Sequence, residues 1–460
     1  MSAQPTATPL APFDGEVHLL LASARARGLT DVEVYARSDE ALTLRANQGA
    51  LESFQRSHSV GIGVRVVQGD RVGYAYSENL TPEALDRLLS EAAENATIVA
   101  GEPGVGLIDE VGEAFSLEDH YNPALGEVPL EAKVTGILRA ETTARACDAR
   151  VKAVPGCVYS EGMSVVRVAS THGLDRHHRT NQAYAVVFPL VSQEGENRTG
   201  LHMHLTRQFD AIDFEAVARE AVGHACRRLG ARSLASGTYP VVFTPRALTD
   251  LLSAFSDVFS AKAAREGKSL LAGKLGEVVA SELVTIVDDA LLPEGFASRP
   301  FDDEGTSSRR CALIERGAFQ TFLHNAQTAR QQGVASTGHA SRGGYKGTLG
   351  VAPTNLFVQP GATPAAALVA GPGPVVVVDD LQGVHAGTNA ISGDFSLQCQ
   401  GWLWVDGVEQ HAVANITVAG NFLTMLAGVE AVGDDLEFHP HGAYIGSPSV
   451  RIAGLAIAGA

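Results

Sequence analysis

Short runs in which apolar and polar residues alternate follow one another near the start of the chain. Before them, an apolar face at helical spacing predicts a helix over residues 13–27, which Gly28 would end. Alternation with a period of two is typical of half-buried strands in an antiparallel sheet. It predicts strands at residues 31–37, 41–45, 51–58, 60–67 and 71–76, the last two forming a hairpin.

A helix and a loop are predicted after these strands. Thr81, followed by Pro82, predicts the start of a helix that runs to about residue 95. Residues 101–126 are rich in glycine, proline and acidic residues and are predicted to form a loop. A second module is predicted to begin near residue 129, with a helix that runs to about residue 149. Strands at 151–159, 162–170, 183–191 and 199–208 and an amphipathic helix at 213–230 complete the module.

The stretch from Tyr239 to Glu304 organises the rest of the chain. A predicted strand at 239–243 leads to Thr244 and Pro245, which are suited to the cap and first position of a helix. Apolar residues then recur at three- and four-residue spacing and predict a long amphipathic helix over residues 245–261. An acidic turn, Phe301-Asp-Asp-Glu-Gly-Thr306, ends the stretch.

From residue 283 onward the pattern is mainly one of short strands and turns. The chain is therefore predicted to be α+β. An N-terminal helix and antiparallel strand-meander modules come first, followed by a β-rich C-terminal domain built around the long helix. The expected boundaries are a disordered tail at 1–12, an N-terminal domain at 13–235 with a possible sub-boundary near 100–128, and a C-terminal domain at 236–460.

Composition and charge exclude several classes of protein. No apolar run reaches the roughly 18 residues that a membrane span needs. The net charge of −17 opposes binding to nucleic acid, and no basic patch offsets it. The polar first residues do not resemble a signal peptide. Five cysteines without a Cys-x-x-Cys pair suggest reduced thiols. We therefore expect a cytoplasmic protein that binds neither nucleic acid nor membrane.

Several histidines raise the question of a metal site. No carboxylate or cysteine joins them at a recognisable ligand spacing, so surface histidines are the favoured interpretation. Their roles stay open at this point. They are His172, His177, His178, His202, His204, His439 and His441.

The C-terminal half carries a series of short motifs whose order and spacing resemble the TldD/PmbA family, and within it the TldE (PmbA) branch. Each motif is weak alone, but nearly all of residues 230–460 matches in order. The motifs are Ser236-Gly-Thr-Tyr-Pro-Val-Val-Phe243, Leu275-Gly-Glu277, Val287-Asp-Asp289, Phe301-Asp-Asp-Glu-Gly305, Leu313-Ile-Glu-Arg-Gly317, Ser336-Thr-Gly338, Gly393-Asp-Phe-Ser396 and Ile416-Thr-Val-Ala-Gly420.

This resemblance implies a particular division of labour. TldD and TldE chains form a cytoplasmic, zinc-dependent heterodimeric peptidase that acts on unfolded or flexible peptides, and the TldD chain carries the zinc motif His-Glu-x-x-x-His. Counting back without gaps from Gly273 places the three motif positions here on Leu252, Ser253 and Asp257. None of them supplies an imidazole. The TldD branch also uses a cysteine near its end, and residues 433–460 contain none.

A catalytic zinc needs about three protein ligands and a carboxylate that activates its water. We therefore expect no metal, no cofactor and no catalytic residue in this chain, with zinc in a TldD-like partner subunit. The chain would instead help to hold an extended peptide. Candidates for lining that cavity are Asp302, Asp303, Glu304, Thr337, Gly338, Asp394 and Ser396.

Two alternatives remain open. The chain could be a homodimeric peptide-binding protein without a TldD partner. It could also be a hydrolase with a non-metal site near the acidic residues 302–304.

Overall fold

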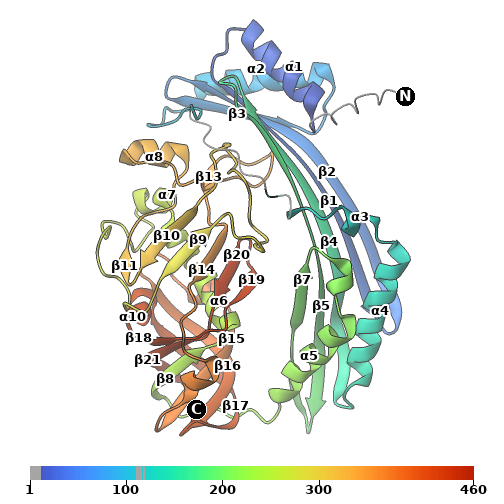
Figure 1. Ribbon diagram of the computed structural model, residues 1–460, viewed down its shortest axis with the longest axis vertical. Helices are drawn as coiled ribbons and strands as arrows, with labels where there is room; N and C mark the ends of the chain where they lie inside the picture. The colour runs from blue at the N-terminus through green and yellow to red at the C-terminus, as the bar shows by residue number, and fades with distance from the viewer. Residues whose placement is uncertain (1–11, 110–116, 118–119, 460) are drawn as a thin grey trace, which may run out of the picture.

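The computed structural model describes residues 12–109, 117 and 120–459. The first half of the chain forms a long curved sheet that runs along one side of the molecule, and the second half forms a β-rich body beside it (Figure 1). The α+β class predicted from the sequence is confirmed. Residues 1–11 of the predicted tail, and part of the predicted sub-boundary near 100–128, lie outside the described residues.

The curved sheet has the strand order β3-β2-β1-β4-β5-β6, with β7 also paired to β5. All these neighbours are antiparallel. The strands are β1 (Val32–Asn47), β2 (Ala50–Gln68), β3 (Arg71–Ser77), β4 (Val151–Ser170), β5 (Asp175–Gln193), β6 (Glu196–Thr199) and β7 (His202–Thr206).

Several strands are longer than the sequence pattern predicts. Residues 31–37 and 41–45 were expected to form two strands, but both belong to β1, and 51–58 and 60–67 both belong to β2. The polar residues between the predicted pieces do not end β1, because it pairs with β2 on one side and β4 on the other through this region. These pairings satisfy the backbone where the alternation is lost.

Helices cover the two ends of the curved sheet (Figure 1). At one end, α1 (Asp14–Ala26) and α2 (Pro82–Ile98) enclose one hydrophobic core. At the other, α4 (Leu130–Ala146) and α5 (Phe214–Arg227) enclose a second core, with the short α3 (Pro123–Glu127) beside them. The long central strands therefore connect two packing units in one sheet.

A small barrel forms the base of the C-terminal body. Strands β17, β16, β15, β8 and β21 follow one another in the sheet, and a pairing between β17 and β21 closes this ring of five. Strand β18 extends it beside β21. The bounds are β8 (Gly237–Phe243), β15 (Pro374–Gln382), β16 (Asp394–Val405), β17 (Val408–Asn421), β18 (Val429–Val432) and β21 (Val450–Ala458).

A second sheet of the C-terminal body has the order β11-β10-β9-β14-β20-β19. Its strands are β9 (Ile286–Asp289), β10 (Arg310–Glu315), β11 (Ala318–Phe319), β14 (Asn355–Val358), β19 (Glu437–Pro440) and β20 (Tyr444–Ser447). A short pair, β12 (Ala340–Ser341) and β13 (Gly350–Val351), and the helices α8 (Ala326–Gln332), α9 (Val384–Gly387) and α10 (Phe422–Ala427) lie in the connections.

The organising helix is shorter than predicted. Helix α6 (Pro245–Ala254) starts as expected, with the Thr244 side chain as its cap, but ends well before residue 261. A 3₁₀ turn (Ser256–Phe259) and the short helix α7 (Ala261–Arg265) follow it. The Ser260 side chain caps α7 and starts a new helical direction, while the 3₁₀ turn keeps its apolar residues in the core.

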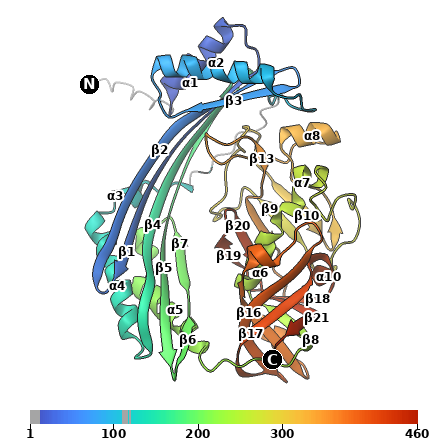
Figure 2. The same cartoon turned by 180° about the vertical axis from the view of Figure 1, so that it is seen from behind.

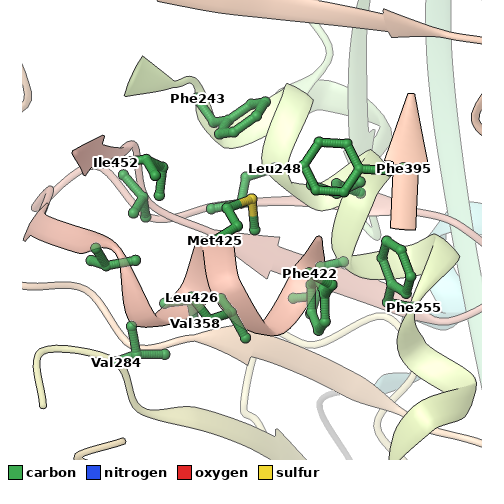
Figure 3. Close-up of a cluster of buried hydrophobic side chains, with 14 of the residues drawn as sticks. Phe243, Leu248, Phe255, Val284, Val358, Phe395, Phe422, Met425, Leu426 and Ile452 are labelled. Atoms are coloured by element: carbon green, nitrogen blue, oxygen red, sulfur yellow. The ribbon is translucent and has the colours of Figure 1, made fainter. Parts of the chain in front are cut away.

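One large core joins the barrel, α6 and the second sheet. Figure 3 shows α10 inserted into this core, with Met425 near Leu248 and Phe422 near Phe255. The rings of Phe255 and Phe422 stack with their centroids 4.5 Å apart. Helix α6 is thus held by apolar packing along one face. No helix in the described ranges is long and apolar enough to cross a membrane.

Candidate functional site

A cavity of about 340 Å³ lies beside the polar face of α6. Three segments that are far apart in the sequence contribute to it: α6, the end of β15 with α9, and the turn between β19 and β20. Its lining comprises Asp250, Ser253, Ala254, Leu381, Gly383, Val384, His385, Ala386 and His441.

Asp250 and His441 form the chemically distinctive pair of this cavity. The Asp250 Oδ1 atom lies 3.5 Å from the His441 Nε2 atom, and both side chains are half-buried. Burial raises the pKa of Asp250 to about 6, an effect that Arg246 opposes and Asp380 reinforces. Burial, together with nearby His439 and Arg246, lowers the pKa of His441 to about 4. At neutral pH an ionised carboxylate therefore stands beside a neutral imidazole, an arrangement that can accept a proton or bind a cationic group.

The three positions expected to replace the family zinc motif lie in three different environments. Leu252 is buried in the core, Ser253 lines the cavity, and Asp257 is exposed beyond the end of α6. Within the described part of the chain, no group of three His, Cys, Asp or Glu side chains is arranged to hold a metal ion. The side chains on α6 thus do not fit a catalytic zinc, which requires about three nitrogen, sulfur or oxygen ligands facing one point.

The acidic turn is buried and binds backbone amides. The Asp302 carboxylate accepts hydrogen bonds from the backbone N–H groups of Glu304 (3.0 Å), Thr306 (2.9 Å) and Ala340 (2.9 Å). The Glu304 carboxylate accepts one from Ala326 N–H at 3.0 Å. Burial raises the pKa of both carboxyl groups. These two residues therefore fix the turn against the segments that follow β11.

Asp303 lies between the two halves of the molecule. Its Oδ2 atom accepts a hydrogen bond from the Arg342 backbone N–H at 2.8 Å, and its Oδ1 atom accepts one from the Tyr35 hydroxyl at 3.3 Å. Tyr35 belongs to β1 of the curved sheet, whereas Arg342 follows β12 of the C-terminal body. The acidic turn is thus placed at the contact between the sheet and this body.

The other predicted cavity residues divide into two places. Thr337 and Gly338 are buried just before β12, and the N–H of Ala340 in β12 donates to the Asp302 carboxylate. Thr337 Oγ1 accepts a hydrogen bond from His324 N–H at 2.6 Å. Asp394 and Ser396 are exposed at the start of β16 in the barrel. There the Asn421 side chain donates to Asp394 Oδ1 at 3.0 Å. The structure brings 302–304 and 337–338 together and leaves 394 and 396 apart.

The seven histidines of open role lie at several places in the structure, with His439 near His441. His172 contacts Asp109 (2.9 Å) and Asp31 (3.0 Å), whereas His441 faces Asp250. The His178 ring packs edge-on against Phe301. The others occupy three strands: His177 on β5, His202 and His204 on β7, and His439 on β19.

Asp250 and His385 were not among the residues predicted to line a cavity. The sequence does place Asp250 and Ser253 three residues apart, off the apolar face of the helix, which is a usable signal. The approach of α9 and of the turn carrying His441 depends on how the barrel meets the second sheet. No local pattern in the sequence encodes that.

Comparisons with known proteins cover nearly the whole chain. Three protein-family models match the chain in order. They are PmbA/TldA metallopeptidase domain 1 at residues 32–96, the central domain at 123–229 and the C-terminal domain at 236–459. Metalloprotease PmbA of Escherichia coli O157:H7 is 26% identical over 443 residues, covering 95% of this chain and 94% of that protein. A metalloprotease TldD homolog of Haemophilus influenzae is 27% identical over 393 residues, covering 82% and 80%.

Solved structures agree. A Thermotoga maritima protein described as a candidate modulator of a DNA gyrase has a TM-score of 0.89 at 29% identity, covering 97% of this chain and all of that one. TldE of Thermococcus kodakarensis has a TM-score of 0.88 at 22% identity, covering 96% and 100%, which shows a shared fold. With all three family domains matched in order and PmbA similar over almost its full length, this chain belongs to the PmbA/TldD metallopeptidase family and is PmbA-like.

Proposed function

We propose that this chain is the non-catalytic, TldE-like subunit of a cytoplasmic zinc-dependent TldD/TldE peptidase. A TldD-like partner would hold the zinc, and this chain would help to form the cavity that takes up unfolded or flexible peptides. The observation that carries the proposal is the placement of the side chains on α6. Leu252 is buried in the core, whereas Asp250 and Ser253 line the cavity.

The burial of Leu252 supports this assignment. Its side chain is 1% exposed and belongs to the core that joins the barrel to the second sheet. An imidazole at this position would lose hydrophobic packing and would be desolvated without a partner. Position 252 therefore serves core packing, whereas the resemblance implies a zinc ligand at this position in the TldD branch.

The surroundings of the cavity suit an extended peptide. Among the described strands of its sheet, β19 is an edge, and the chain after it carries His441 into the cavity. An edge strand can pair with a peptide backbone with little dependence on sequence. The Asp250 carboxylate lies at this end and would attract a basic side chain or a free amino terminus of the peptide.

Cleavage of an unfolded protein such as reduced casein tests the proposal. We expect the purified chain alone to be inactive with or without added Zn²⁺, and its mixture with the TldD-like chain of the same organism to cleave casein until EDTA is added. EDTA-sensitive cleavage by this chain alone would overturn the assignment, as would an unchanged rate when it is omitted from the mixture. Size-exclusion chromatography with light scattering would distinguish the heterodimer from a peptide-binding homodimer.

A matched pair of variants tests the cavity. Asp250→Asn removes a charge from the cavity, whereas Asp394→Asn makes the same change at an exposed position. In the mixture with the TldD-like chain, we expect Asp250→Asn to raise the KM for peptides with basic residues by about tenfold, the scale of one lost ion pair in a partly buried site. We expect Asp394→Asn to leave this KM unchanged. Equal KM values for the two variants would remove Asp250 from the substrate site.

The Asp250–His441 pair favours a second candidate, a hydrolase without metal. A carboxylate whose pKa lies near 6 is suited to act as a general base toward water. This candidate requires cleavage by the chain alone that resists EDTA and is abolished by Asp250→Asn. Loss of all activity in EDTA would eliminate it.

A further inference from the structure

A second cavity, of about 400 Å³, lies where the curved sheet meets the C-terminal body. Figure 2 shows α7 and α8 below the end of the sheet that carries β3 and α2. Residues of β2 and β3 line one side, α7, α8 and the segment around residue 342 the other, and residues 99–105 complete it. This cavity is separate from the one beside α6, because the two share no lining residue.

Two buried guanidinium groups line this cavity. Arg65 is 8% exposed and Arg342 is 6% exposed. Both bind the same carboxylate, since Arg65 Nη2 lies 2.7 Å from Glu33 Oε2 and Arg342 Nη2 lies 2.6 Å from Glu33 Oε1. The Nε atoms of both arginines are buried and have no hydrogen-bond acceptor among the described residues. A buried N–H without an acceptor is costly, so both guanidinium groups keep unused hydrogen-bonding capacity.

Glu304 is a buried acidic residue of the cavity wall, whereas Glu102 and Glu266 line the cavity with exposed side chains. Burial raises the pKa of this carboxyl group; Glu33 acts in the same direction, and Arg65 and Arg342 oppose them. Asp302, two residues away, is also a buried carboxyl with a raised pKa. When Glu304 is protonated, the pair of guanidiniums and Glu33 carry one uncompensated positive charge. A bound anion, in addition to the Glu33 carboxylate, would therefore be accommodated together with a proton on Glu304.

The rim carries charges of both signs, since the exposed Glu102 and Glu266 line the cavity as Lys262 and Arg265 do, and the wall is well fixed. Lys262 and Arg265 are exposed on α7 and line the cavity. Residues 102–104 are tied to α8 by hydrogen bonds from Gln327 Nε2 to Glu102 Oε2 (2.9 Å) and from Arg330 Nη1 to Gly104 O (3.2 Å). The cavity is thus preformed.

We propose that this cavity binds a small molecule through an oxyanion group, a carboxylate or a phosphate, held by Arg65 and Arg342. A guanidinium presents several N–H donors in one plane, which matches two oxygens of either group. The volume is that of a small-ligand site. Because its walls come from both halves of the molecule, the ligand stabilises the contact between the sheet and the C-terminal body.

Isothermal titration calorimetry at constant ionic strength tests this with three probes: inorganic phosphate, N-acetylglycine and N-acetylglycinamide. We expect phosphate or N-acetylglycine to bind and to raise the melting temperature, and the uncharged amide to do neither. Which of the two anions binds more tightly identifies the source of the oxyanion. Heats of dilution alone for both anions, or equal binding of N-acetylglycine and its amide, would overturn the proposal.

Variants locate the binding. The double variant Lys262→Gln with Arg265→Gln changes exposed side chains only, and we expect it to weaken binding by about tenfold. Arg309→Gln, an exposed arginine that does not line the cavity, is the matched control and leaves affinity unchanged. An equal affinity of the double variant and this control would place the anion elsewhere.

Glu304→Gln tests the inner wall. The amide oxygen can still accept the hydrogen bond from Ala326 N–H, so the turn is preserved. We expect this variant to bind the anion at least threefold more tightly, since a competing negative charge is gone. We also expect it to abolish the proton uptake that should accompany anion binding in the wild type. Titrations repeated in buffers of different ionisation enthalpy measure this uptake. Binding with unchanged affinity and unchanged proton uptake would contradict the assigned site.

Discussion

Replacing Glu33 with glutamine should weaken the contact between the curved sheet and the C-terminal body. Glu33 lies on β1, is 2% exposed, and bridges Arg65 on β2 to Arg342 after β12. The amide has the shape of the carboxylate but no charge. The substitution therefore removes the charge of the carboxylate that both buried guanidinium groups contact.

The size of the effect follows from the burial of all three groups. Breaking a buried ion pair by removing one partner costs about 3–5 kcal/mol, because the remaining charge stays desolvated. We expect Glu33→Gln to lower the free energy of unfolding by about 3 kcal/mol or more at pH 7, measured by urea denaturation with far-UV circular dichroism. Glu40→Gln is the control on the same strand. Glu40 pairs with Arg56 at 3.5 Å, and the two side chains are 41% and 73% exposed, so its loss should cost less than about 1 kcal/mol.

The pH dependence gives an independent check. Burial alone would raise the pKa of Glu33, but Arg65 and Arg342 outweigh it and leave that pKa below its ordinary value. A carboxyl with a lowered pKa in the folded state stabilises the protein above its unfolded pKa, and this stabilisation is lost as the pH falls through the folded value. The difference between wild type and Glu33→Gln should therefore shrink below about pH 4. A cost at pH 7 no larger than that of Glu40→Gln would refute the reasoning.

Three further predictions test other parts of the structure. Gly401→Ala should lower the free energy of unfolding by more than about 2 kcal/mol, because an added Cβ would clash with the backbone of the neighbouring barrel strand. Gly223→Ala in α5 places its Cβ in open space and should raise the free energy of unfolding by about 0.5–1 kcal/mol. Urea denaturation compares the two variants. The pKa of Asp250 is raised in the folded state, so the ionised carboxylate opposes folding at high pH. Asp250→Asn should therefore be more stable than wild type at pH 8, and this gain should be lost by pH 4. A difference in melting temperature between variant and wild type that is the same at both pH values would contradict this. Cys147 is exposed and Cys157 is buried, so Ellman's reagent should show a fast phase that Cys147→Ser removes and Cys157→Ser leaves intact.

Much of the fold could be predicted because its local signals are strong. Thr244 and Pro245 mark the start of α6, and the alternation before and after Gly69 marks the hairpin of β2 and β3. The errors lie where tertiary contacts override local pattern. Strand β1 continues through a polar stretch because both its neighbours supply hydrogen bonds, and the helix stops at Ala254 although apolar spacing continues. Cap residues such as Ser260 can restart a helix inside an apolar pattern.

The candidate sites were harder to predict, because each joins distant segments. The acidic turn was singled out for its charge, yet Asp302 is occupied with backbone amides, and Glu304 lines a cavity at the contact between the sheet and the C-terminal body. The partner of Asp250 is His441, which belongs to the turn between β19 and β20 of the second sheet. Charge and turn propensity identify polar residues in a sequence. They do not reveal whether a carboxylate faces a cavity or the backbone.

The environment of α6 also determines what a metal-binding side chain would meet at position 252. Leu252→His would place an imidazole in a core position that is 1% exposed, where it loses packing worth about 2–5 kcal/mol and finds no ligand partner. Asp257 lies in the 3₁₀ turn beyond Ala254, so the helix no longer presents that position on the face that carries Ser253. A zinc-binding helix must keep its ligands on one face through more than one turn. The early end of α6 and the core packing at Leu252 act together, so both the register and the packing would have to change before this helix could hold a metal.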